Sequence, residues 1–314
     1  ICSDKTGTLT LNQMTARAFL LRGRRFTVEG EGYTAEGDIL AEEGAAVPDL
    51  EALLLPAVLC NDSHIRGGQL IGDPTEGALL ALAAKGGIDV DGVEQRYPRI
   101  AEVPFDSARK YMATFHHDGD RVRVVVKGAP DVLLGRCARL LDEAGETAFG
   151  DPARQKLLAE NEAMAGRGLR VLAIAVRTLP ALEFDPAGDV LRYVDELCLQ
   201  GLVGIMDPPR SEAREAIALC RTAGIEVKMI TGDHRATAVA IARELGLTGE
   251  ALTGAELDAL SEAELAERIG RISVFARVAP EHKVKLVQAL QKAGHVVAMT
   301  GDGVNDAPAL KAAN

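Results

Sequence analysis

Residues 225–246, IEVKMITGDHRATAVAIARELG, combine a strand, a tight turn and a helix in one short stretch. The segment IEVKMI is largely apolar, TGD is a turn, and RATAVAIARELG places apolar residues at helical spacing. Apolar strands that alternate with amphipathic helices are typical of a parallel sheet covered by helices on both faces. This stretch therefore predicts a βαβ unit.

The same alternation continues on both sides of the stretch. Helices are predicted at 208–224 and 281–294, and strands at 272–275 and 295–299. The first three residues, ICS, read as one more buried strand of this sheet. The parallel domain is therefore expected to be interrupted by a long insertion.

The insertion, residues 15–206, has a different texture of strands and hairpin turns. Residues 109–130 predict two antiparallel strands joined around Asp118 and Gly119, and further strands are expected at 169–177 and 198–205. Helices are predicted at 48–60, 75–85, 130–141 and 153–165. The predicted fold is thus a Rossmann-type parallel α/β sheet with an inserted antiparallel α+β domain.

Composition excludes several classes of function. The 314 residues carry a formal net charge of -11, and no basic block is longer than Arg24-Arg25, so a nucleic-acid partner is not expected. The five cysteines lack CxxC spacing, which favours reduced thiols over a zinc site. No apolar run approaches the roughly 20 residues of a membrane helix, and no signal peptide is visible. We expect a soluble piece cut from a longer protein.

Three acidic turns each follow an apolar strand directly. They end in Asp4, Asp233 and Asp302. Ligands of an open parallel sheet bind outside the carboxyl ends of its strands, so these turns should converge. Converging carboxylates favour a hard cation, and Mg²⁺ fits best because it also bridges to phosphate. Taken singly, Asp233 and Asp302 could instead be helix N-caps.

Asp4 is a candidate nucleophile. A carboxylate can attack phosphorus when the like-charge repulsion is neutralised, and the product is an aspartyl phosphate. Mg²⁺ held through Asp302, the ammonium of Lys283, the hydroxyl of Thr231 and the backbone amide of Gly232 could provide that neutralisation.

Thr6 stands two residues after the candidate nucleophile. In phosphatases of the haloacid-dehalogenase kind this position usually holds a second Asp that acts as general acid and base. A threonine removes that group, so a phosphoenzyme should persist. Persistence is useful only if the acyl phosphate is an energised intermediate.

Five motifs, DKTGTLT, KGAPD, MDPPR, MITGDH and TGDGVNDAPALK, occur in an order that resembles the cytoplasmic part of P-type cation-transporting ATPases. The resemblance runs the length of the chain. It implies a haloacid-dehalogenase-like phosphorylation domain formed by residues 1–14 and 207–314, and a nucleotide-binding domain at 15–206. CNDS, DPTEGAL, KGAPD and DPPR resemble the type II, calcium-pump-like members most. Asp131 and His234 are small departures from the motifs.

The resemblance also implies a phosphorylation site. Asp4 is similar to the phosphorylated aspartate, with Lys283, Thr231 and Asp306 in the catalytic group. The implied magnesium ligands are Asp4, Thr6 through its carbonyl, and Asp302. The implied phosphate-binding residues are Thr6, Gly232, Asp233 and Asn305.

A nucleotide site is implied in the insertion. Its residues would be Glu76, Phe105, Lys127, Gly128 and Arg170, with Arg210 of MDPPR added where the chain returns from the insertion. Each has a simpler alternative. Lys127 could be a solvated strand lysine, Phe105 a core aromatic, and Glu76 and Arg170 members of surface ion pairs.

The implied activity is transfer of the γ-phosphate of ATP, with Mg²⁺, to Asp4, which drives cation transport in the intact pump. The partners would be the pump's own transmembrane and actuator domains, and this piece would not bind the transported cation. The implied location is the cytoplasmic face of a membrane, in the bacterial plasma membrane. Two alternatives stay open: a phosphatase with a cap domain, and a nucleotide-sensing module without chemistry.

Overall fold

The computed structural model describes residues 1–301, 303 and 306–314. The chain forms two units. Unit 1 comprises Ile1–Asn12, Gly166–Gly168 and Asp207–Asn314, and unit 2 comprises Gln13–Ala165 and Leu169–Met206. Two of the predicted site residues, Asp302 and Asn305, lie outside the described residues.

Unit 1 contains a five-stranded parallel sheet in the order β15-β16-β14-β1-β17. The strands are β1 (Cys2–Asp4), β14 (Lys228–Ile230), β15 (Glu250–Thr253), β16 (Ile272–Ala276) and β17 (Met299–Thr300). The first three residues therefore do join the later sheet, as predicted. β1 lies between β14 and β17, so the chain order reverses beside it, and such a switch point opens a ligand crevice at the carboxyl ends of the strands.

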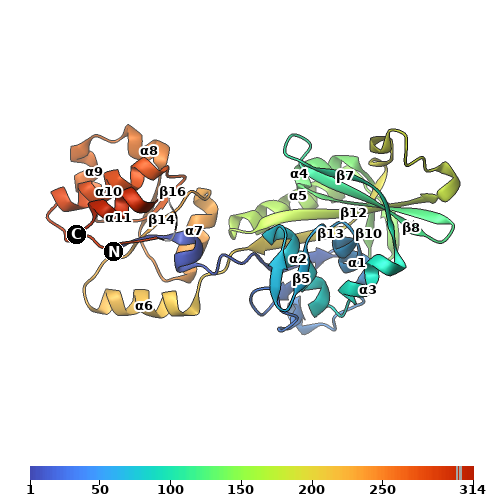
Figure 1. Ribbon diagram of the computed structural model, residues 1–314, viewed down its shortest axis with the longest axis horizontal. Helices are drawn as coiled ribbons and strands as arrows, with labels where there is room; N and C mark the ends of the chain where they lie inside the picture. The colour runs from blue at the N-terminus through green and yellow to red at the C-terminus, as the bar shows by residue number, and fades with distance from the viewer. Residues whose placement is uncertain (302, 304–305) are drawn as a thin grey trace. The chain divides into compact units, whose positions relative to one another are not determined.

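Helices connect these strands (Figure 1). They are α6 (Ser211–Thr222), α7 (Arg235–Glu244), α8 (Gly254–Ala259), α9 (Glu262–Arg268), α10 (Pro280–Lys292) and α11 (Ala307–Ala312). In α10, Leu286, Val287 and Leu290 are buried at helical spacing and pack in the core of unit 1 with Ile230 and Phe275. The buried face of α10 also includes Lys283, near the start of the helix.

Unit 2 is built on a ten-stranded sheet whose main path is β4-β3-β2-β13-β12-β9-β8-β7. Its strands are β2 (Thr15–Leu21), β3 (Arg24–Val28), β4 (Ile39–Ala41), β7 (Arg99–Asp106), β8 (Tyr111–Asp118), β9 (Arg121–Gly128), β10 (Cys137–Asp142), β11 (Gly145–Ala148), β12 (Arg170–Pro180) and β13 (Leu197–Met206). The path is antiparallel, and only the branch strand β10 pairs in parallel, with β13. Every residue of β13 is buried, as expected for a central strand.

The predicted hairpin is confirmed, because β8 and β9 pair along their whole length; its turn consists of Gly119 and Asp120, one residue later than predicted. A separate two-stranded hairpin consists of β5 (His64–Arg66) and β6 (Gln69–Ile71). The helix α2 (Pro74–Lys85) follows this hairpin in the chain.

The helices of unit 2 are α1 (Glu51–Leu59), α2 (Pro74–Lys85), α3 (Val90–Arg96), α4 (Pro130–Leu133) and α5 (Asp151–Gly166). α1 is apolar on nearly all sides, and its residues from Leu53 to Leu59 are buried between the sheet and α2. Asp73 caps α2, because its carboxylate accepts hydrogen bonds from the amides of Thr75 and Glu76.

One predicted helix is wrong in its second half. Residues 130–141 begin as the short helix α4, but Cys137–Asp142 form β10, which pairs with β11 and β13. The helix-forming residues of this segment are overridden by strand pairing, since β10 gains backbone partners on both edges.

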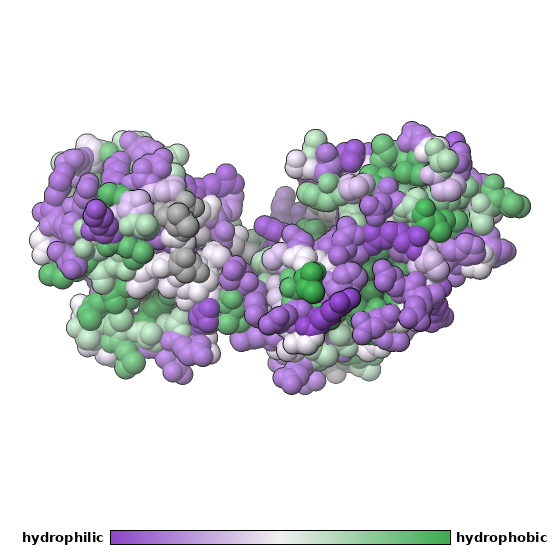
Figure 2. Space-filling model, in the orientation of Figure 1, coloured by the Kyte–Doolittle hydropathy of each residue, from purple (hydrophilic) through white to green (hydrophobic). Residues whose placement is uncertain are grey.

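On the face seen in Figure 2, hydrophilic residues cover most of the surface and hydrophobic residues form separate groups. Among the residues that the structure describes, no helix is both long and apolar enough to cross a membrane.

Candidate functional site

Asp4 ends β1 and is met by a lysine from a distant helix. The ammonium nitrogen of Lys283 lies 2.5 Å from Oδ1 of Asp4 and 2.5 Å from Oδ1 of Asp306. The Asp306 side chain is only 3% exposed and that of Asp4 14% exposed. One cation is therefore shared by two largely buried carboxylates.

The environment keeps Lys283 charged. Burial alone would lower its pKa, but the hydrogen bonds to Asp306 and Asp4 outweigh burial and hold the pKa above its ordinary value. A permanently charged ammonium beside Asp4 is suited to attracting an anionic group to that carboxylate.

A second lysine organises the turn after Asp4. Lys5 is 3% exposed, and its ammonium lies 2.7 Å from Oδ2 of Asp233 and 3.5 Å from Oδ2 of Asp207. Asp207 also accepts a 2.5 Å hydrogen bond from the hydroxyl of Thr10. Asp233 and Asp207 therefore act on this turn through Lys5 in the described structure. The pairing of Lys5 with Asp233 was not predicted from the sequence.

Thr231 and Gly232 follow β14 at the same edge of the sheet. Asp4 is in register with Ile230, so both residues stand next to the end of β1. Thr231 is 2% exposed and accepts a hydrogen bond from the amide of Asp233, whereas a Cβ at Gly232 would meet no atom within 4 Å. This open space beside the strand ends would admit a ligand.

The N-cap interpretation of Asp233 is wrong. The N-cap of α7 is His234, whose Nδ1 accepts from the amide of Ala236, while the Asp233 carboxylate pairs with Lys5. His234, a departure from the motif, thus has a local structural role.

Asp306 also needs space that a glycine provides. A Cβ at Gly301 would lie 2.5 Å from Cγ and from Oδ2 of Asp306, closer than real contacts allow. The carboxylate accepts a 3.1 Å hydrogen bond from the amide of Gly303 as well. Gly301 is therefore part of the site, although the sequence analysis gave it no such role.

Magnesium chemistry fits the oxygen atoms that are present. Asp4 offers a carboxylate, and Thr6, with φ -72° and ψ 128°, follows in an extended conformation that leaves a backbone carbonyl near the strand end. Within residues 1–301, 303 and 306–314, no group of three or more His, Cys, Asp or Glu is arranged to hold a metal ion. The third predicted ligand, Asp302, lies outside those residues.

Unit 2 has its own cavity, of about 610 Å³. It is lined by apolar groups and by charged groups of both signs. The residues used below are Asp62, Ser63, Glu76, Phe105, Lys110, Lys127, Gly128 and Arg170. All five nucleotide-site residues predicted in the insertion therefore line one cavity.

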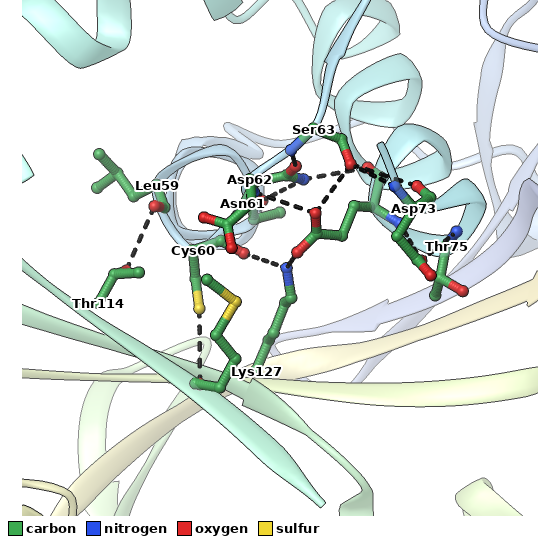
Figure 3. A network of polar contacts seen from close by, with 12 residues as sticks. Leu59, Cys60, Asn61, Asp62, Ser63, Asp73, Thr75, Thr114 and Lys127 are labelled. Atoms are coloured by element: carbon green, nitrogen blue, oxygen red, sulfur yellow. Dashed lines mark hydrogen bonds and ion pairs between the residues drawn. The ribbon is translucent and has the colours of Figure 1, made fainter. Parts of the chain in front are cut away.

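Lys127 and Glu76 form a buried ion pair on the wall of this cavity. Their side chains are 9% and 12% exposed, and the ammonium also donates to the carbonyl of Cys60. Figure 3 shows Lys127 reaching from its strand toward Cys60. Lys127 is therefore no solvated lysine, and Glu76 is no member of a surface pair.

Phe105 is presented to the cavity by an irregular strand. β7 is an edge strand, and its pairing with β8 shifts register between Val103 and Asp106, around Pro104. Proline lacks an N–H and is tolerated at such an edge, and a bulge redirects the neighbouring side chains. Phe105 is 64% exposed, so the core-aromatic alternative is wrong.

Two cations lie at the more open part of the cavity lining. Arg170 donates a 3.2 Å hydrogen bond to the hydroxyl of Thr75 and has no carboxylate partner among the described residues. Lys110 pairs with Asp131 at 3.0 Å, with both side chains more than half exposed. Lys110 was not predicted, although it lies five residues after Phe105 in the stretch PFDSARK, residues 104–110.

Gly128 follows Lys127 in β9 and allows this strand to approach β8 closely. A Cβ there would lie 2.5 Å from the carbonyl oxygen of Lys110 and 2.6 Å from Cβ of Tyr111, so β8 and β9 approach too closely for a side chain. Because Gly128 has no side chain, β9 can lie close to β8, and Lys127 of β9 then lines the cavity.

Arg210 belongs to unit 1 and does not line the cavity of unit 2. Its guanidinium donates 3.0 Å hydrogen bonds to the carbonyls of Thr10 and Gly7, which ties the first and last parts of unit 1 together. Its contact with a nucleotide stays a prediction.

A parallel sheet with an acidic residue at the end of its first strand, interrupted by an α+β insertion, defines a haloacid dehalogenase-like hydrolase domain carrying a second domain. Residues 179–314 match the family of haloacid dehalogenase-like hydrolases. Residues 49–212 match the family described as P-type ATPase, cytoplasmic domain N. The chain belongs to the P-type ATPase family.

Several known proteins are similar to this chain along its whole length. It is 47% identical to a cation-transporting ATPase of Synechocystis sp., 45% to a calcium-transporting ATPase of Bacillus subtilis and 44% to a calcium-transporting ATPase of Lactococcus lactis. Each match covers 100% of this chain and 36%, 36% and 34% of the respective relative. The chain thus spans about a third of the length of these proteins and matches the cytoplasmic domains of cation-transporting P-type ATPases.

Proposed function

We propose that this chain is the catalytic part of a cation pump, in which ATP bound in the cavity of unit 2 phosphorylates Asp4 of unit 1. Unit 1 would be the phosphorylation domain and unit 2 the nucleotide-binding domain. The observation that carries the proposal is the ammonium of Lys283, 2.5 Å from Asp4 at the carboxyl end of β1.

The geometry supports phosphoryl transfer to Asp4. In the proposed step a carboxylate oxygen of Asp4 forms a bond to the γ-phosphorus, the bond from that phosphorus to the β–γ bridging oxygen breaks, and ADP leaves. Lys283 offsets negative charge on the transferred group, and the open space at Gly232 admits it. Mg²⁺, when bound by Asp4, the carbonyl of Thr6 and Asp302, would supply further charge neutralisation.

The phosphorylated form should be long-lived. The side chain two residues after Asp4 is Thr6, which cannot act as a general acid or base at neutral pH. A soluble phosphatase of this fold would need such a group for turnover, so Thr6 favours the pump over the phosphatase alternative.

The cavity of unit 2 suits a nucleotide. The exposed ring of Phe105 and the apolar wall can hold a flat heteroaromatic base, and Lys110, Lys127 and Arg170 can contact polar or anionic groups. The predicted phosphate-binding roles of Thr6, Thr231, Gly232, Asp233 and Asn305 belong to the same proposal.

Calcium transport is the proposed cation specificity, because two of the relatives named above are calcium-transporting ATPases and the motifs resemble that type. We further propose that the intact protein acts at the cytoplasmic face of a bacterial plasma membrane. Its transmembrane and actuator domains would be the partners of this chain, and the transported cation would bind outside it.

The first test is labelling with ATP that carries ³²P at the γ position, in the presence of Mg²⁺. We expect an acid-stable, hydroxylamine-sensitive label on the wild-type chain and none on Asp4→Asn, with binding of ATP retained by the variant. A label that persists in Asp4→Asn would contradict the assignment of Asp4. Absence of ATP binding, together with fast hydrolysis of small phosphate esters, would favour the phosphatase alternative.

A further inference from the structure

Residues 59–63, which are the last residue of α1 and the loop after it, lie between two cavities of unit 2. The cavity of about 610 Å³ is lined by Asp62 and Ser63, and a second cavity of about 430 Å³ is lined by Leu59, Asn61 and Ser63. Leu59, Cys60, Asn61 and Ser63 are nevertheless buried, and Leu59 and Cys60 belong to the hydrophobic core of unit 2. The polar atoms of this segment therefore need hydrogen-bond partners inside the protein, and those partners help to fix its position.

On the side of the larger cavity, this loop holds the Lys127–Glu76 ion pair. The Cys60 carbonyl accepts from Lys127, and Oε2 of Glu76 accepts from the amide of Asp62 at 3.0 Å and from the hydroxyl of Ser63 at 2.9 Å. Figure 3 shows the labelled loop residues gathered around the end of Lys127. The loop thus contributes to the orientation of both charged groups, which also bond each other.

On the opposite side, Arg99 at the start of β7 binds three residues of the loop, and the hydroxyl of Thr114 also donates to the Leu59 carbonyl at 3.3 Å. Nη1 of Arg99 lies 2.6 Å from Oδ1 of Asp62, and Nη2 donates to the carbonyl of Asn61 at 2.6 Å and to that of Leu59 at 3.4 Å. Arg99 lines the smaller cavity, and its side chain is 23% exposed. The planar guanidinium can bind several acceptors at fixed angles, which a lysine cannot do.

The same strand carries a second element of the site. β7 begins with Arg99 and presents Phe105 near its other end. Arg99 is also anchored to its own strand by Glu102, at 2.8 Å from Nη1. β7 therefore links the loop behind Glu76 and Lys127 to the aromatic side chain on the cavity wall.

We propose that Arg99 is a positioning residue for the ligand cavity of unit 2: it fixes the loop 59–63, and through that loop the orientation of Glu76 and Lys127. The identity of the ligand as ATP rests on the proposed function. Arg99 does not touch the ligand itself, since it lines the other cavity.

The test measures binding of ATP to the 314-residue chain by calorimetry. We expect Arg99→Met to weaken ATP binding about tenfold, equivalent to roughly 1.4 kcal/mol. Arg99→Lys should bind ATP little better than Arg99→Met, because one ammonium cannot bind the several acceptors that the planar guanidinium binds. Arg123→Met is the matched control. Arg123 lies in β9, is 26% exposed and pairs with Asp118, but does not line the larger cavity.

A double-mutant cycle separates positioning from general destabilisation. If Arg99 acts through Glu76, the combination with Glu76→Gln should weaken binding much less than the product of the two single effects. Independent effects that multiply would overturn the proposal, and so would an Arg99→Met protein that binds ATP as the wild type does.

A second measurement needs no ligand. The amide of Asp62 donates to Glu76, so its hydrogen exchange should become faster in Arg99→Met and stay unchanged in Arg123→Met. Unchanged exchange at Asp62 in Arg99→Met would overturn the role of Arg99. A wild-type chain that fails to bind ATP would count against the proposed function alone, and exchange would then decide the role of Arg99.

Discussion

The ammonium of Lys283 lies 2.5 Å from Oδ1 of Asp4, and the two residues are 279 positions apart in the chain. The same ammonium lies 2.5 Å from Oδ1 of Asp306, which is almost fully buried. Without Lys283, two carboxylates in a poorly hydrated space would lose the ammonium that they share. The loss should affect both the stability of unit 1 and the chemistry at Asp4.

Replacing the lysine should damage both properties. Lys283→Met should destabilise unit 1 by about 3–5 kcal/mol, the usual cost of breaking a buried ion pair, and should lower the rate of Asp4 phosphorylation at least about a hundredfold. Calorimetric unfolding and ³²P labelling would measure the two effects. Lys285→Met is the control, because Lys285 lies on the same helix and is 38% exposed. Labelling at the wild-type rate in Lys283→Met would contradict the proposed role.

A second substitution separates the two effects. Adding Asp306→Asn to Lys283→Met removes one of the two carboxylate charges that lose the ammonium, so it should recover part of the lost stability. It should not recover phosphorylation, because the ammonium beside Asp4 is still absent. Recovery of both would mean that Lys283 serves only the fold.

Gly301→Ala should disturb the site without changing any charge. The added Cβ would lie 2.5 Å from the carboxylate of Asp306, which must then move away from Lys283. We expect phosphorylation to fall by about tenfold or more, with ATP binding in unit 2 unaffected. Gly270→Ala is the matched control, because a Cβ there meets no atom within 4 Å. Equal labelling of the two variants would show that Asp306 can shift without effect.

The sequence predicted the parts of this structure that depend on local pattern. Apolar strands between amphipathic helices indicated the parallel sheet, and the turn at Asp118 and Gly119 indicated the hairpin. The order of the acidic turns placed Asp4 at a strand end, and the register of β1 with β14 and β17 agrees with that prediction.

Other features depend on contacts between distant segments and could not be read from local pattern. The second half of residues 130–141 looks helical, but β10 forms because β11 and β13 supply backbone partners. Two ion pairs, Lys5–Asp233 and Arg99–Asp62, also join distant segments. No local sequence pattern indicates that these residues are neighbours. Lys110 could have been found from the sequence, since it lies five residues after the predicted Phe105.

Phe105 offers a direct test of the cavity. Phe105→Ala should weaken ATP binding about tenfold, because a base would lose an aromatic partner and the apolar area that the ring covers. Ile100→Ala is a control on the same strand: Ile100 is 37% exposed but does not line the cavity. Calorimetric titration of both variants measures the difference. Binding that weakens equally in both would point to a general effect on β7.

The stability of unit 2 should depend on pH through His116. Burial lowers the pKa of His116 to about 4 from an ordinary 6.5, although its hydrogen bond with the carbonyl of Tyr97 acts in the opposite direction. Between these two values the unfolded chain binds a proton that the folded chain does not, so stability falls as the pH is lowered. The loss from this residue should be about 3 kcal/mol between pH 7 and pH 4.

The tyrosines make this measurement specific to unit 2, because all four tyrosines of the chain lie in it and the chain has no tryptophan. Urea unfolding followed by tyrosine fluorescence at a series of pH values would give the free energy of unfolding. His116→Gln should flatten the dependence between pH 6.5 and pH 4. His117→Gln is the matched control, since the neighbouring His117 side chain is exposed. Carboxylates contribute acid dependence to all three proteins, so the difference between them isolates His116. An identical pH profile for wild type and His116→Gln would mean that the folded chain can protonate this buried ring at little cost.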